Sequence, residues 1–263
     1  MMRRKRFLPL LIAACIAAGS MNAGGGDSRE DFRAAARLAR DGDLQADWDK
    51  MLDARERFRA FTADEKLAAL AHYYLGYTYW RLSSLVYVAV GPGAQIPLLE
   101  RAVSSLEEAI RKQPEFPDAH ALLAICLGMQ ASVDQSRTDR LVPRIRSAWE
   151  AALPAGAANP RVMLLRAMGL TFAPPPYGDR EKGLKLWREA IEAFPAERPD
   201  PLLPDWGHVE AVAWLGGALL ALNQPEEAVG WLERAARMRP DFWWAAKAAL
   251  PVARRPITAE PGR

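Results

Sequence analysis

Apolar side chains recur along most of this chain at the three- and four-residue spacing of amphipathic α-helices. Between residues 44 and 61 they share one helical face, made of Leu44, Trp48, Met51, Leu52, Phe58 and Phe61. No stretch keeps the sustained apolar–polar alternation that is typical of a β-strand. Proline and glycine interrupt the apolar runs at intervals, at Gly91-Pro92-Gly93, Gln113-Pro114, Asn159-Pro160, Pro174-Pro175-Pro176, Pro204 and Arg239-Pro240. The pattern predicts an all-α protein with about eleven helices between Ser28 and Leu250.

Two short motifs predict where helical runs begin. Ser28-Arg-Glu-Asp31 and Thr62-Ala-Asp-Glu65 have the form of a capping box. In this motif a hydroxyl and an acidic side chain three residues later satisfy free N–H groups at a helix start. We therefore expect helical runs to open at Ser28 and at Thr62.

Helices this short must bury their apolar faces against neighbours, and stacked helix pairs leave an internal repeat in the sequence. The repeat is clearest near the C-terminus, where Val212-x2-Leu215-Gly216-x2-Leu219 precedes Ala228-x3-Leu232-x2-Ala235-x4-Pro240. This spacing resembles the tetratricopeptide repeat (TPR), a helix–turn–helix unit of about 34 residues. Only Val212 departs from it, where the family prefers Trp or Leu. The resemblance implies that Gly216, Ala228 and Ala235 let paired helices approach closely while the leucines fill the seam between them.

Three earlier stretches are similar to the same unit, with insertions. Leu75-Gly76-x2-Tyr79 is followed, about 14 residues later than in the family, by Ala102-x3-Leu106-x2-Ala109-x4-Pro114. The pair His120-x2-Leu123-Ala124-x2-Leu127 and Ile145-x3-Trp149-x2-Ala152 fits more loosely, and Pro154 is expected to end its second helix early. Leu165-x2-Met168-Gly169-x2-Phe172 pairs with Gly183-x3-Trp187-x2-Ala190-x4-Pro195. We place the four units near residues 69–116, 117–161, 162–197 and 209–242.

The rest of the chain divides around this array. We predict capping helices over 28–61, a TPR-like α-solenoid of antiparallel helix pairs over 62–250, and a disordered tail over 251–263.

The apolar insertion 84–97 either lengthens a helix against the cap or forms a partner-binding loop, and the first is favoured. Pro174-Pro175-Pro176-Tyr177 is interpreted as a rigid turn between helices. Trp206, in a second insertion, is expected to pin its loop onto the stack, with a ligand-facing role as the alternative.

The first twenty residues have the features of a secretory signal peptide. A basic segment (Met1 to Arg6) precedes an apolar stretch (Phe7 to Ala18) that is too short to span a bilayer. A glycine-rich linker over 21–27 follows. Because Leu11-Ile12-Ala13-Ala14-Cys15 resembles a lipoprotein lipobox, lipidation at Cys15 is the alternative to plain cleavage near Ser20. The protein is therefore expected to be exported and periplasmic or secreted, with a lipid anchor at Cys15 as the only membrane attachment considered.

Charge argues against nucleic-acid binding once the signal is removed. The chain has 35 Lys and Arg against 32 Asp and Glu, but Arg3, Arg4, Lys5 and Arg6 belong to the predicted signal. Without them the balance is 31 basic to 32 acidic residues, which provides no footprint for phosphate backbones. The mature chain would keep a single cysteine, Cys126, which lies on an apolar helix face and is expected to be a buried hydrophobe.

No familiar catalytic or metal-binding pattern is present. His72, His120 and His208 lie far apart, and no HExxH, Gly-x-Ser-x-Gly, P-loop or Rossmann motif occurs. We therefore predict no enzymatic activity, no cofactor and no metal site.

The most suggestive feature is aromatic. In the TPR family certain first-helix positions line a concave binding groove, and the resemblance carries them to Tyr73, Tyr77, Trp80 and Arg81, to Met129, and to Arg166. Tyr, Trp and Arg are common in binding hot spots. The open alternative is that the cap helices cover these aromatics and bury them.

The leading functional hypothesis is therefore a scaffold or adaptor that binds an unidentified protein or peptide of the cell envelope. Two further hypotheses remain: a small-molecule-binding or solute-transport accessory protein, and an uncharacterised hydrolase.

Overall fold

The protein is all-helical over residues 28–255, the part that the computed structural model describes, and this range contains no β-strand. The predicted signal peptide, the linker and Cys15 lie outside this range. The α-helices are α1 (Ser28–Gln45), α2 (Trp48–Ala60), α3 (Ala68–Val90), α4 (Ile96–Lys112), α5 (Pro117–Val133), α6 (Thr138–Gly156), α7 (Pro160–Phe172), α8 (Arg180–Ala193), α9 (His208–Ala221), α10 (Pro225–Met238) and α11 (Leu250–Ala253). The 3₁₀ segments η1 (Gln135–Arg137) and η2 (Phe194–Ala196) and the π-helical η3 (Trp244–Ala249) complete the described elements.

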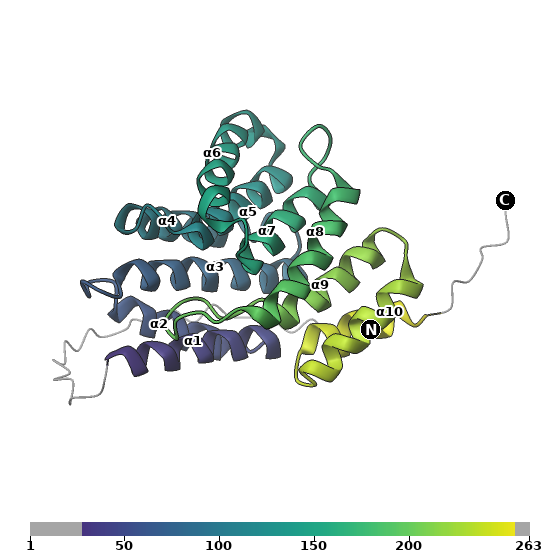
Figure 1. The fold of residues 1–263 in the computed structure, drawn as a ribbon, viewed down its shortest axis with the longest axis horizontal. Coiled ribbons are helices and arrows are strands. Elements are labelled where there is room, and N and C mark those ends of the chain that lie inside the picture. Colours follow the sequence, from purple (N-terminus) through teal and green to yellow (C-terminus); the bar gives the residue numbers. More distant parts are fainter. Residues whose placement is uncertain (1–27, 256–263) are drawn as a thin grey trace, which may run out of the picture.

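Consecutive helices pack as antiparallel hairpins: α1 with α2, α3 with α4, α5 with α6, α7 with α8, and α9 with α10 (Figure 1). Each hairpin then packs on the next. This arrangement confirms the predicted all-α, solenoid-like fold. It follows from the sequence pattern, because each second helix carries one apolar stripe that only its neighbours can cover.

Glycine sets the distance between paired helices in two units. A Cβ at Gly76 would lie 2.6 Å from Leu106 Cγ and 3.3 Å from the Ala102 carbonyl oxygen. A Cβ at Gly216 would lie 2.7 Å from Leu232 Cγ and 3.2 Å from the Ala228 carbonyl oxygen. The two contacts are equivalent, so the Gly, Ala and Leu positions of the repeat meet in space as the spacing predicts.

Several predicted boundaries were wrong. The apolar face over 44–61 is divided between α1 and α2, because Ala46 has φ 53° and Asp47 caps α2 through Lys50 N–H. Thr62 does not open a helix. Asp64 instead accepts from the N–H groups of Lys66 and Leu67 just before α3 begins.

Prolines are also better tolerated than expected. Pro154 does not end α6, which continues to Gly156 with Pro143 and Pro154 inside it. The predicted tail also starts too early, because residues 251–253 belong to α11. The insertion at 84–97 does lengthen α3, as favoured, but the last helical turn, which includes Val88 and Val90, is exposed rather than packed on the cap.

The array curves until its two ends meet (Figure 1). From α1, Asp41 accepts from Arg239 at 3.2 Å, and Gln45 donates to Asp241 at 2.9 Å. Both partners follow α10 directly. The N-terminal hairpin therefore contacts the last repeat as well as the first, so it does more than cover one open end.

Candidate functional site

The curvature creates an inner face, which we define as the surface of α3, α7 and α9 that is turned toward α1. Residues 197–207, here called the strap, are non-helical and run between α1 and α3 along this face (Figure 1). Leu202 and Trp206 of the strap are buried.

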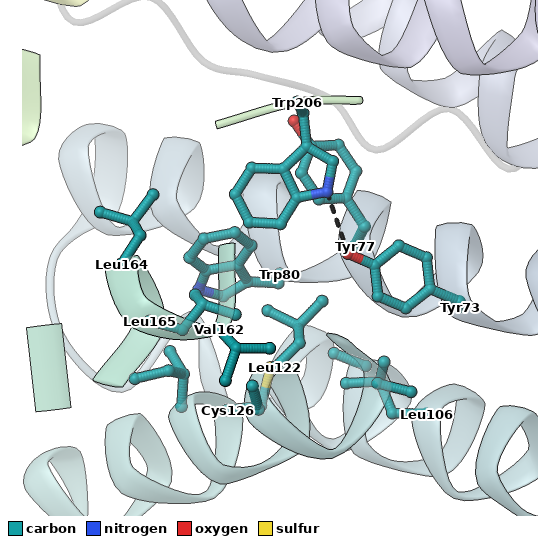
Figure 2. Packing of buried hydrophobic residues seen from close by; sticks show 14 of the residues in the cluster. Tyr73, Tyr77, Trp80, Leu106, Leu122, Cys126, Val162, Leu164, Leu165 and Trp206 are labelled. Atoms are coloured by element: carbon teal, nitrogen blue, oxygen red, sulfur yellow. Dashed lines mark hydrogen bonds between the residues drawn. The ribbon is translucent and has the colours of Figure 1, made fainter. Parts of the chain in front are cut away.

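The aromatic residues of α3 form the centre of the inner face and are covered. Tyr73, Tyr77 and Trp80 have at most 1% of their surface exposed. Trp206 lies over Tyr77 and Trp80, with ring centroids 5.0 and 5.8 Å away, and its indole N–H donates to the Tyr73 hydroxyl at 2.9 Å (Figure 2). The three residues are therefore buried, as in the open alternative, but the ring that lies over Tyr77 and Trp80 belongs to Trp206 of the strap and not to a cap helix. Trp206 pins its loop as expected. Burial raises the pKa of the Tyr73 and Tyr77 hydroxyls well above the ordinary value.

Arg161, at the start of α7, holds the strap at both ends. Its guanidinium donates to Glu197 through both terminal nitrogens and to the Trp206 carbonyl at 3.1 Å. Its Nε donates to Asp118 of α5 at 2.9 Å. Burial works against the charged guanidinium, but Asp118 and Glu197 outweigh it and raise the pKa of Arg161. The side chain is fully satisfied and acts as an internal anchor.

A second charged cluster joins α1, α3 and α9. Asp43 accepts from Arg81 at 2.6 Å and from the Tyr77 hydroxyl at 3.2 Å. Glu210 accepts from Gly207 N–H at 3.1 Å, but its other oxygen is buried without a hydrogen-bond partner. Burial, with Asp43 nearby, raises the pKa of Glu210 from 4.5 to about 7.

Arg81 is shared between the predicted site and this cluster. Its guanidinium lies 4.8 Å from the ring centroids of both Trp80 and Trp214, and 12% of its side chain is exposed. It is therefore held on three sides by its own chain.

Met129 and Arg166 remain partly exposed. Met129 Sδ accepts from the Trp80 indole N–H at 3.2 Å, so it borders the aromatic cluster. The Arg166 guanidinium lies 4.9 Å from the Trp149 ring centroid. Burial lowers the pKa of Arg166, and within residues 28–255 no carboxylate pairs with it. Of the six predicted residues, Arg166 is therefore the best placed to pair with a carboxylate from outside the chain.

Sequence reasoning missed the polar half of this region. Asp118 and Glu210 are buried beside residues far away in the sequence, Arg161 for the first and Asp43 for the second. The repeat spacing does not single out Asp43, Arg161 or Glu197. A charged residue within an apolar helix was the only available hint.

Cys126 and His120 have structural surroundings in the described part of the chain. Cys126 is buried and burial raises the pKa of its thiol. Over residues 28–255 no group of histidine, cysteine and acidic side chains converges as a metal site would require, and no helix there is long and apolar enough to cross a bilayer. His120 Nε2 lies 2.8 Å from the Pro114 carbonyl oxygen, a contact that fastens a loop.

The fold and this region define a class: an array of helical hairpins whose inner face holds a segment of its own chain. A scan with protein-family models finds no match to the sequence, and a search of curated proteins finds none either.

Proposed function

We propose that the protein is a TPR-like scaffold whose inner face binds an extended segment of another protein. One observation carries this proposal: the inner face already holds an extended polypeptide, the strap. It does so with a tryptophan packed at a tilt against two aromatic rings, an arginine on a main-chain carbonyl, and an arginine–carboxylate pair. Tryptophan, tyrosine and arginine are the residues that most often dominate the binding energy of protein interfaces.

The partner segment would extend beyond the strap to the partly exposed Met129 and Arg166. Arg166 stacks on Trp149 and lacks an acidic partner among the described residues, so a carboxylate from the partner would complete it. Met129 offers an adaptable apolar contact beside the aromatic cluster. The preferred ligand is therefore an extended segment with an acidic residue next to an apolar or aromatic one.

The proposal includes export of the protein to the cell envelope. The basic and apolar segments at 1–18 favour delivery of the protein to the cell envelope, where the partner would be found. Cleavage near Ser20 and lipidation at Cys15 remain the two alternatives for the mature N-terminus.

Peptide display tests this function without knowledge of the partner. A random peptide library selected on the mature protein should yield sequences enriched in acidic residues. Arg166→Glu should lose these sequences, because it replaces the attraction with repulsion, while Arg166→Lys should keep part of them. A selection with no enrichment, or the same peptides on Arg166→Glu, would refute the proposal.

A further inference from the structure

The charged cluster that joins α1, α3 and α9 contains two carboxylates and one guanidinium. Asp43 of α1 pairs with Arg81 of α3 at 2.6 Å and also accepts from the Tyr77 hydroxyl. Glu210 of α9 has no such partner, because one oxygen accepts only from Gly207 N–H and the other is buried without a hydrogen bond. When both carboxylates are ionised, the cluster therefore has one negative charge more than its guanidinium can neutralise.

The surroundings of Glu210 favour its protonated form. Burial has the largest effect on its pKa, and the facing carboxylate of Asp43 acts in the same direction. Arg81 and the N–H groups at the start of α9 act the other way, and the outcome is a pKa raised from 4.5 to about 7. Tyr77 of α3 contributes a hydroxyl that is neutral over this range, because burial raises its pKa well above the ordinary value.

His208 lies at the same end of α9 and titrates in the opposite sense. Its ring stacks on Phe194 with centroids 5.5 Å apart, and its Nε2 is buried without a hydrogen-bond partner. Burial lowers the pKa of His208, Arg234 of α10 acts in the same direction, and Glu192 of α8 opposes both. His208 therefore becomes charged as pH falls, whereas Glu210 becomes charged as pH rises.

The segments that cover Glu210 are held by contacts that are easy to break. Asp43 lies in the last turn of α1, next to the exposed hydrogen bond from Gln45 to Asp241. The strap is non-helical, and its Asp205 is held by Arg40 of α1 through an exposed ion pair at 2.7 Å. Exposed ion pairs contribute little to stability, and helix ends and irregular segments open locally at lower cost than packed helices.

We propose that the strap and the last turn of α1 open together when Glu210 loses its proton. Ionised Glu210 repels Asp43 in an interior that solvates neither charge well. Movement of the last turn of α1 carries Asp43 away and admits water to Glu210. The inner face is thus closed by a proton, and this opening does not depend on what the inner face binds.

Linkage gives the direction and size of the effect. In the open form Glu210 is solvated and has its ordinary pKa of 4.5, while in the closed form its pKa is about 7. The contribution to closure is complete below about pH 4.5 and is lost as pH rises through 7. The opening equilibrium should therefore increase by about 10- to 100-fold between pH 5 and pH 8.

Hydrogen exchange of the mature protein, followed by mass spectrometry and corrected for the intrinsic rate at each pH, measures this opening. We expect residues 41–45 and 197–207 to exchange faster than α5 at both pH values, because they open without global unfolding. Glu210→Gln keeps the size of the side chain and removes its charge. Since His208 titrates in both proteins, the ratio of wild-type to Glu210→Gln exchange isolates Glu210, and it should rise by about 10- to 100-fold from pH 5 to pH 8.

Glu226→Gln is the matched control, because Glu226 is exposed on α10, and it should exchange as the wild type does. Glu210→Met, which also removes the charge, replaces Glu210→Gln if that variant does not fold. A ratio that is the same at pH 5 and pH 8 would overturn the proposal. Exchange in the strap that is as slow as in α5 would also overturn it, because the strap would then open only when the whole protein unfolds.

Discussion

At the scale of single residues, the most unusual feature is a carboxylate buried within the packed helices. Glu210 is the extreme case, since it is 1% exposed and has one oxygen without a hydrogen-bond partner. Asp43 from α1 faces it, and Arg81 and Tyr77 from α3 lie in the same cluster. Such a carboxylate is costly to ionise in the interior.

This burial predicts a pH dependence of folding stability. The pKa of Glu210 is raised from 4.5 to about 7, so the folded protein binds its proton more tightly than the unfolded chain does. The stability contribution is complete below about pH 4.5 and is lost as pH rises through 7. Glu210→Gln should therefore resemble the wild type at pH 5 and exceed its free energy of unfolding by about 2–3 kcal/mol at pH 8.

Urea unfolding at the two pH values measures this difference. Glu226→Gln, an exposed glutamate in the first turn of α10, is the control and should change stability little at either pH. The same gap between wild type and Glu210→Gln at pH 5 and pH 8 would show that Glu210 does not titrate as described.

At the scale of elements, the close approach of paired helices depends on particular glycines. In Gly216→Ala the new methyl group would lie 2.7 Å from Leu232 Cγ and 3.2 Å from the Ala228 carbonyl oxygen. Since the backbone oxygen cannot move away without separating α9 from α10, we expect a loss of about 1–3 kcal/mol in stability. Gly76→Ala meets the equivalent contact with Leu106 and should behave alike.

Gly230 supplies the internal control. It lies in α10, and a Cβ there has nothing within 4 Å. Gly230→Ala should therefore raise stability by about 0.5–1 kcal/mol, because alanine favours the helix. Thermal unfolding compares the three variants. A Gly216→Ala protein as stable as Gly230→Ala would contradict the packing described for this hairpin.

The elements also show what the sequence can and cannot predict. Helical spacing predicted the hairpins because each stripe, as in α4 and α10, reflects local burial. Helix ends were less predictable, since Asp64 rather than Thr62 organises the turn before α3 and Pro154 was accommodated within α6. A cap depends on a few local hydrogen bonds, and several side chains can supply them.

At the scale of the whole molecule, closure of the array decides which predicted site residues are accessible. The spacing placed Tyr73, Tyr77 and Trp80 together on one face of a helix, and they do lie together. Trp206, which buries them, lies 133 positions after Tyr73 in the chain. No local sequence pattern encodes a contact over that separation. Repeat spacing therefore placed the aromatic residues together, while the segment that covers them became visible only in three dimensions.

The central claim is that the inner face is a binding surface for extended polypeptide, occupied in this chain by the strap. A Trp206→Ala variant of the mature protein vacates the aromatic part of that surface while keeping the rest of the chain. The strap sequence as a free peptide, residues 197–207, carries the missing tryptophan, and the same peptide with alanine at that position is its matched control. Trp206→Leu serves in place of Trp206→Ala if the latter fails to fold.

The most direct measurement is the melting temperature of this variant with each peptide. A ligand that binds only the folded state at ten times its Kd stabilises by about 1.4 kcal/mol, which is about 3–6 °C for a chain of this size. We predict that increase with the tryptophan peptide and none with the alanine peptide. Equal melting temperatures with the two peptides would contradict the account.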